Sequence, residues 1–322
     1  MQERFFFVKI STMSKRTQGN IMLLFTAIIW GMAFVAQTVA MDHIGAYTFI
    51  ASRFLLGGLA LLPVIMVADR VRPEIRDLAP TQKKQLRKLS IKGGIVCGCI
   101  LFISSSLQQV GIIYTTTAKA GFVTALYIIF VPFIGIFIRR KIHIMTWVCA
   151  LIAVVGFYLL CIHEGFSINY GDLLMLFCAI CFACHITAVD YFNFSGVDGI
   201  RLSCTQFFTC CVLGIIMVLI KERDIFSLAA LWDAKVAILY TGICSSGIAY
   251  TLQILGQKHT EPATASLLMS MESVFAALAG WLFLHQILTL RELCGCFLVF
   301  VAVLIAQLYP DIQKKFKKSW TK

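Results

Sequence analysis

The sequence predicts an all-α polytopic membrane protein of ten transmembrane helices, built as two inverted five-helix repeats. The composition, the spacing of the apolar stretches and an internal repeat lead to this prediction. Of the 322 residues, 59% are hydrophobic and only 14% are charged. So few charges cannot cover the surface of a soluble protein of this length. We therefore expect lipid to be the solvent for most of the chain.

Apolar stretches of about 20 residues recur along the sequence, which is the length an α-helix needs to cross about 30 Å of hydrocarbon. Ten spans are expected, at residues 20–41, 46–68, 91–112, 117–138, 143–162, 171–192, 200–220, 235–257, 262–284 and 290–309. The first span is too long for a cleaved signal peptide, so we expect it to be retained. Whether translation starts at Met1 or at Met13 stays open.

Lys and Arg residues are distributed unevenly between the two sides of the predicted bundle. The side that holds both termini carries 21 of them and the opposite side carries four. Because basic loops stay in the cytoplasm, we expect both termini to be cytoplasmic and the protein to lie in the cell membrane. This placement accounts for the net charge of +12, so we expect no nucleic-acid partner.

The chain repeats itself at constant offsets of 152 residues for the first span and 145 residues for the third. The matched pairs include Gly19 with Gly171, Phe25 with Phe177, Gln108 with Gln253, and Gly111 with Gly256. Two repeats follow, residues 1–165 and 166–322, each with five spans. Because five is odd, the second repeat enters the membrane from the opposite side, and inverted repeats are the architecture of alternating-access carriers.

An ionisable residue deep inside a predicted span is a candidate functional residue, because a charge there costs several kcal/mol unless it is paired or hydrated. Glu272 lies about ten residues into the ninth span, near the bilayer midplane. The equivalent position in the first repeat is Tyr127, in the fourth span, and we call two such residues repeat-mates. Arg53 lies about seven residues into the second span. Arg53 could pair with Glu272 as a structural ion pair, or it could bind a carboxylate or phosphate of a substrate through its planar fork.

Neutral polar and aromatic side chains extend this candidate site at helical spacing. They are Trp30, Phe34 and Gln37 on the first span, Gln108 on the third, and Ser246, Tyr250, Gln253 and Gln257 on the eighth. Such faces suit the wall of a cavity for a small solute. The same side chains also hold helices together through hydrogen bonds, so both interpretations stay open.

A run of cysteines in the sixth span, Cys178, Cys181 and Cys184 followed by His185, resembles a metal-binding signature. The segment has the length of a membrane span and no clear fourth ligand nearby, so we interpret it as a packed helix face and expect no metal and no cofactor. His185 itself titrates in a range that suits relay of a coupling proton. A hydrogen-bonded packing role is the alternative.

Several motifs together carry a resemblance to a known family. They are Ile29-Trp30-Gly31 and Phe34-Val35-Ala36, Ala51-Ser52-Arg53-Phe54, Leu107-Gln108, Pro132, and the stretch from Glu261 to Phe275. With these motifs the chain resembles the EamA-type family of the drug/metabolite transporter superfamily, with Ser273 where that family usually has proline. The resemblance implies a secondary transporter of ten helices around a central substrate cavity.

We therefore expect a secondary carrier for a small organic metabolite, such as an amino acid or a related zwitterion, with export as one direction. Arg53 would hold an anionic group, Glu272 a cationic group or a coupling proton, and Trp30 and Tyr127 would form apolar walls. The partners expected are the small-molecule substrate and the bilayer; a homodimer is left open. Catalytic signatures such as H-E-x-x-H and G-x-S-x-G are absent, so no catalytic residues are expected. A channel, a non-transporting scaffold and an intramembrane enzyme are the alternatives.

Overall fold

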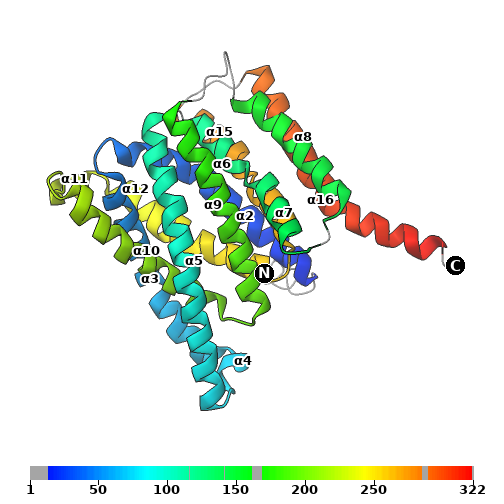
Figure 1. Cartoon of the computed structure of the whole chain (residues 1–322), viewed down its shortest axis with the longest axis horizontal. Helices are drawn as coiled ribbons and strands as arrows, with labels where there is room; N and C mark the ends of the chain where they lie inside the picture. The colour runs from blue at the N-terminus through cyan, green and yellow to red at the C-terminus, as the bar shows by residue number, and fades with distance from the viewer. Residues whose placement is uncertain (1–13, 116, 141, 162–168, 285–288, 321–322) are drawn as a thin grey trace, which may run out of the picture.

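The computed structural model describes residues 14–115, 117–140, 142–161, 169–284 and 289–320, and every regular element in these ranges is helical (Figure 1). The first repeat contains α2 (Lys15–Met41), α3 (Ala46–Val71), α4 (Pro73–Arg76), α5 (Pro80–Tyr114), α6 (Thr117–Ala125), α7 (Tyr127–Phe137) and α8 (Ile144–Cys161). The second contains α9 (Tyr170–Phe194), α10 (Gly199–Met217), η1 (Val218–Glu222), α11 (Leu228–Asp233), α12 (Lys235–Leu239), η2 (Tyr240–Tyr250), α13 (Thr251–Gln257), α14 (Pro262–Met269), α15 (Glu272–Leu284) and α16 (Leu290–Trp320). The two alternative starts, Met1 and Met13, and the predicted boundary between the repeats at residue 165 lie outside the described ranges.

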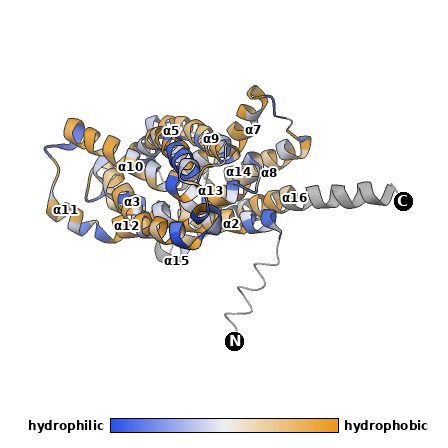
Figure 2. Cartoon of the chain, turned by 90° about the horizontal axis from the view of Figure 1, so that it is seen from below, coloured by the Kyte–Doolittle hydropathy of each residue, from blue (hydrophilic) through white to orange (hydrophobic). Residues whose placement is uncertain are grey.

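Each of the ten expected spans coincides with helix. Within the described residues, seven helices are long and apolar enough to cross a membrane, and three shorter apolar helices cover Val123–Phe137, Ile144–Gly156 and Leu293–Ala306. Hydrophobic residues lie along the outer helices (Figure 2), where large side chains such as Phe25 and Val212 are exposed. These outward apolar faces fit contact with lipid. The all-helical class is confirmed, whereas the count of ten spans stays a prediction.

The repeat seen in the sequence has a counterpart in the packing. Helix α2 packs against η2, α13, α14 and α15, and its repeat-mate α9 packs against the equivalent helices α5, α6 and α7. A Cβ atom at Gly19 would lie 2.8 Å from the carbonyl oxygen of Gly256, and one at Gly171 would lie 2.8 Å from that of Gly111. Only glycine permits such an approach between helices. The same contact therefore holds α2 to α13 and α9 to α5.

Both the fourth and the ninth span are broken at equivalent positions. Helix α6 gives way to α7 at Leu126, and α14 gives way to α15 at Ser270 and Met271. Backbone bonds three residues apart tighten each break, from Leu126 N to Val123 O at 3.2 Å and from Met271 N to Leu268 O at 3.3 Å. In the ninth span the Ser270 hydroxyl also donates to a carbonyl of the preceding turn, which bends helices.

Charged groups join both ends of α3 to the helix formed by α10 and η1. At one end the Glu222 carboxylate accepts hydrogen bonds from the backbone N–H groups of Tyr47 and Thr48, at 2.9 and 2.8 Å, and from the Thr48 hydroxyl at 2.8 Å. At the other end Arg201 pairs with both Asp69 and Asp198. The negative charge of Glu222 beside the first turn of α3 also interacts favourably with the positive end of that helix's dipole.

We expect Glu222→Ala to lower the free energy of unfolding by about 2 kcal/mol, because two backbone donors and a hydroxyl lose a charged acceptor. The change is read as a fall of several degrees in the apparent Tm of the protein in detergent. Asp224→Ala, at an exposed acid two residues later, is the matched control. Equal Tm values for the two variants would show that the Glu222 contacts do not stabilise the fold.

Candidate functional site

A small cavity lies between the two repeats, beside both helix breaks. Its lining comprises Trp30, Phe34, Gln37, Arg53, Gln108, Thr124, Tyr127, Phe182, Ser245, Tyr250 and Glu272. Its volume is about 30 Å³, far below the roughly 300–1,000 Å³ of pockets that hold drug-sized molecules. We call it the central cavity. Because Tyr127 and Glu272 are the first residues of α7 and α15, the two breaks place these repeat-mates side by side.

The two charged residues of the central cavity are almost completely buried, with Arg53 2% and Glu272 4% exposed. Arg53 donates from Nη1 to Oε1 of Gln37 at 3.2 Å, and its Nε has no partner. The Glu272 carboxylate accepts a hydrogen bond from the Tyr127 hydroxyl at 3.0 Å. Each charge thus has a neutral partner, so the ion pair between Arg53 and Glu272 considered from the sequence is not formed in this conformation.

Aromatic rings form one wall of the central cavity. The rings of Trp30 and Tyr250 lie 4.7 Å apart between centroids, and Tyr250 also contacts Phe54 and Phe207. The Trp30 indole N–H donates to the carbonyl of Ser245 at 3.3 Å. The guanidinium of Arg53 lies over the ring of Phe54, 4.6 Å from its centroid, which favours the cation through the ring quadrupole.

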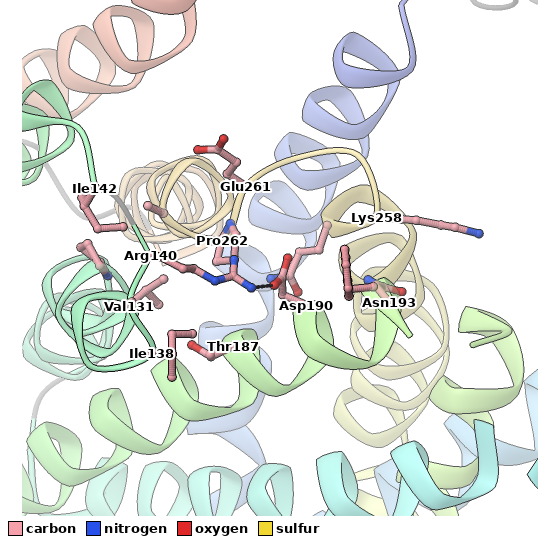
Figure 3. Close-up of a pocket in the computed structure, with 15 residues that line it drawn as sticks. Val131, Ile138, Arg140, Ile142, Thr187, Asp190, Asn193, Lys258, Glu261 and Pro262 are labelled. Carbon is pink, nitrogen blue, oxygen red and sulfur yellow. Dashed lines mark hydrogen bonds and ion pairs between the residues drawn. The ribbon is translucent and has the colours of Figure 1, made fainter. Parts of the chain in front are cut away.

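A larger pocket of about 460 Å³ lies at one end of the bundle, where α7, α9 and α13 end and α14 begins (Figure 3). We call it the vestibule. An ion pair between Arg140 and Asp190 crosses it from the α7–α8 connection to α9. Gln257, Lys258 and Glu261 also line it. Charged side chains therefore surround an opening that is wide compared with the central cavity.

The opposite end of the bundle is closed at the position equivalent to the vestibule. There Phe34, Ile112, Ala120 and Met175 form a buried cluster, with Met41 and Ala276 packed against it. By the repeat offsets, Ile112, Ala276 and Met41 are the mates of the vestibule residues Gln257, Val131 and Asn193. A Cβ at Gly31 would lie 2.5 Å from that of Phe275, so α2 and α15 meet closely here. Among the described residues, one end of the bundle thus holds a wide pocket, whereas the equivalent positions at the other end are filled by packed side chains.

Comparison with known proteins identifies the family. The EamA-like transporter family matches the chain twice, at residues 17–162 and 169–307. The chain belongs to the EamA-like transporter family. The resemblance noted in the sequence is therefore confirmed, and with its many apolar helices this EamA-like chain is a membrane protein.

Relatives of this EamA-like chain include an uncharacterized transporter of Archaeoglobus fulgidus, 29% identical over 91% of this chain and 87% of the relative. Another is the uncharacterized transporter YoaV of Bacillus subtilis, 21% identical over 86% of this chain and 92% of the relative. A protein crystal structure shares the fold, with a TM-score of 0.70, 17% identity, and coverage of 91% and 97% of the two chains. The names of both relatives describe transporters.

Seven of the eight residues predicted to bind substrate line the central cavity of this EamA-like transporter: Trp30, Gln37, Arg53, Gln108, Tyr127, Tyr250 and Glu272. The eighth, Gln253, does not. It is 1% exposed, and its Oε1 has no partner. Ser273, which replaces the proline usual in the family, donates to the carbonyl of Gly121 at 3.0 Å and so joins α15 to α6.

His185 lies behind the cavity wall instead of in it. Its Nε2 and Oε1 of Gln206 are 3.1 Å apart, and its ring meets that of Tyr250 edge-on at 6.1 Å. This geometry favours the packing interpretation over direct contact with a solute. Of the neighbouring thiols, Cys178 is buried and Cys184 is exposed. Among the described residues no group of three or more His, Cys, Asp or Glu side chains is arranged to hold a metal.

Three residues that line the cavity, Thr124, Phe182 and Ser245, were not predicted. Thr124 lies one turn before Tyr127, so the helical spacing could have indicated it. At α-helical spacing Ser246 is the neighbour of Tyr250, but the residue that lines the cavity is Ser245. The reason is that η2 is a π-helix, in which the neighbouring residue is five positions away instead of four. No sequence signal places Phe182, which depends on how α9 packs against the other repeat.

Proposed function

We propose that this protein is a secondary carrier that moves a small zwitterionic metabolite, an amino acid or a related compound, across the cell membrane by alternating access. One observation carries the proposal: a buried cavity holds one arginine and one glutamate, and each is bonded to a neutral side chain instead of to the other. An arginine and a glutamate held apart complement a molecule that carries both charges.

The chemistry of each group supports its assigned partner. Burial of an isolated charge is costly, and a solute carboxylate would supply the acceptor that Nε of Arg53 lacks. The planar guanidinium favours carboxylates through two parallel hydrogen bonds. Glu272 would accept from the ammonium group, or it would carry a coupling proton. Trp30 and Tyr250 would contact the remainder of the solute.

The topology that we propose has ten spans in two inverted repeats, with both termini in the cytoplasm. Under this orientation the vestibule faces the cytoplasm, since Arg140 and Lys258 belong to the basic side. The vestibule is the open end of the bundle, so this conformation faces inward. A solute that loads from the cytoplasm would be exported, which is the direction we propose.

The deciding experiment is counterflow in proteoliposomes with a panel of radiolabelled amino acids. We expect saturable counterflow for a subset of them, because binding at Arg53 and Glu272 requires both a carboxylate and an ammonium group. The amides and the N-acetyl derivatives of the same amino acids each lack one charge and are the matched competitors. Flux that does not saturate would indicate a channel, and the absence of counterflow across the panel would refute the proposed substrate class.

If Glu272 carries the coupling proton, Glu272→Gln should abolish uptake driven by a pH gradient and leave exchange of loaded amino acid intact, because the amide cannot release a proton. Both rates are measured in the same proteoliposomes, with Glu74→Gln, an exposed acid on α4, as control. Loss of exchange together with a raised KM would make Glu272 the site for the ammonium group instead. Loss of folded protein alone would disprove the coupling role.

Arg53→Lys should weaken binding by about ten- to hundredfold, because lysine keeps the charge and loses the planar fork, and a hydrogen bond to a charged group contributes about 1.5–3 kcal/mol. Binding of the transported amino acid is measured by the shift of Tm in detergent. Arg70→Lys, on the exposed end of α3, is the control. Unchanged affinity in Arg53→Lys would assign Arg53 a structural role.

A further inference from the structure

The repeat-mates Gln108 and Gln253 occupy different surroundings. Gln108, on α5, lines the central cavity. Gln253, on α13, is buried, lies outside the lining, and has an amide oxygen with no hydrogen-bond partner. An amide without a partner in an apolar environment costs about 1–3 kcal/mol. The sequence places both glutamines in equivalent positions, so their difference needs a structural cause.

The helices that carry the two glutamines are packed equivalently. Gly111, three residues after Gln108, meets Gly171 of α9, and Gly256, three residues after Gln253, meets Gly19 of α2. Each glutamine is thus at the same distance along its helix from the same glycine contact. The difference between them therefore comes from other features: α5 is α-helical throughout whereas α13 follows the π-helix η2, and the rest of the bundle is arranged differently around each helix.

The two ends of the bundle differ in how they are packed. The end of the bundle near Gln257 holds the vestibule, whereas the equivalent end near Ile112 is filled by the cluster around Phe34 and Met175. Two inverted repeats can adopt unequal conformations and exchange them, which closes one end and opens the other. The present structure corresponds to one of these two states.

We propose that Gln253 enters the central cavity, and that Gln108 leaves it, when the transporter opens to the outside. This inference rests on the alternating-access part of the proposed function. In the exchanged state Gln253 takes the surroundings that Gln108 has here, and its amide oxygen faces the cavity. The solute then contacts a glutamine amide in both states, from α5 when the protein faces inward and from α13 when it faces outward.

Tyr127 and Glu272 behave differently under the same exchange. They are repeat-mates of each other and share a hydrogen bond. When the two repeats exchange conformations, each of the two residues takes the surroundings of the other, so the same two residues stay together. They therefore line the cavity in both states. A solute that crosses the protein keeps its contact with this pair and changes its glutamine partner.

Sided labelling of cysteine variants tests the inference without a known substrate. Gln108→Cys and Gln253→Cys are treated with a membrane-impermeant trimethylammonium methanethiosulfonate in right-side-out and in inside-out vesicles. Mass spectrometry then reads each position separately from the 13 natural cysteines. The reagent, like a solute, enters the central cavity only when the surrounding helices move. We expect Gln108→Cys to react from the cytoplasmic side and Gln253→Cys from the external side, each about tenfold faster than from the opposite side, since only a hydrated thiol forms the reactive thiolate.

Ile254→Cys is the matched control, because Ile254 is buried beside Gln253 and lines neither pocket; it should stay unlabelled from both sides. The buried Cys97 and Cys178 are internal references for intact packing. If Gln253→Cys is not labelled from outside, or is labelled only from the cytoplasm, the inference is wrong. The proposed carrier function is not affected by that result. Equal labelling of both variants from both sides would indicate a continuous pore and refute the proposed carrier.

A second measurement applies if Gln253→Cys does not fold. Gln253→Leu should raise KM for the amino acid found in the counterflow panel when it is added outside, and leave the cytoplasmic KM unchanged. Gln108→Leu should do the reverse. A loss of packing would alter both sides equally, so only an opposite pattern in the two variants supports the exchange, and any other pattern contradicts it.

Discussion

The structure depends on one constraint: in hydrocarbon, a polar group must find its partner inside the protein. Backbone groups meet this requirement by forming helices, and the apolar side chains of those helices face lipid. Arg53 and Glu272 cannot meet it at a lipid-facing position, so they require an interior. The packed helices enclose that interior, and the neutral groups of Gln37 and Tyr127 supply the first partners.

The two repeats enclose this interior by using the same structural features twice. The same glycine contact occurs twice, at Gly19 with Gly256 and at Gly171 with Gly111, and the same break occurs in the fourth and ninth spans. Equivalent breaks bring Tyr127 and Glu272 together where the two repeats meet. Since the two residues differ in chemistry, a pair of equivalent positions yields a hydrogen bond and a single charge instead of two repelling carboxylates.

Much of this could be predicted from the sequence, because a membrane restricts the options. Span length, repeat offsets and helical spacing indicated the helices and seven of the lining residues. Local departures from α-helical geometry could not be predicted: the π-helix η2 brings Ser245 to the cavity instead of Ser246. Contacts between distant segments were also missed, such as Arg140 with Asp190, since no local pattern pairs them. Gln253 was placed by the polar stripe on its helix and by its symmetry with Gln108, and the structure is not symmetric.

The size of the central cavity links binding to motion. A cavity of about 30 Å³ is far smaller than the pockets of roughly 300–1,000 Å³ that hold small molecules, so a zwitterion with several heavy atoms enters only when the surrounding helices move. The breaks at Leu126 and Met271 interrupt the two helices that carry Tyr127 and Glu272, and such element ends absorb changes in backbone angles during domain movement. A solute between Arg53 and Glu272 would therefore favour the conformations that enlarge the cavity. Since a ligand shifts an equilibrium by its differential affinity for the two states, the same contacts that recognise the solute would drive the change of state.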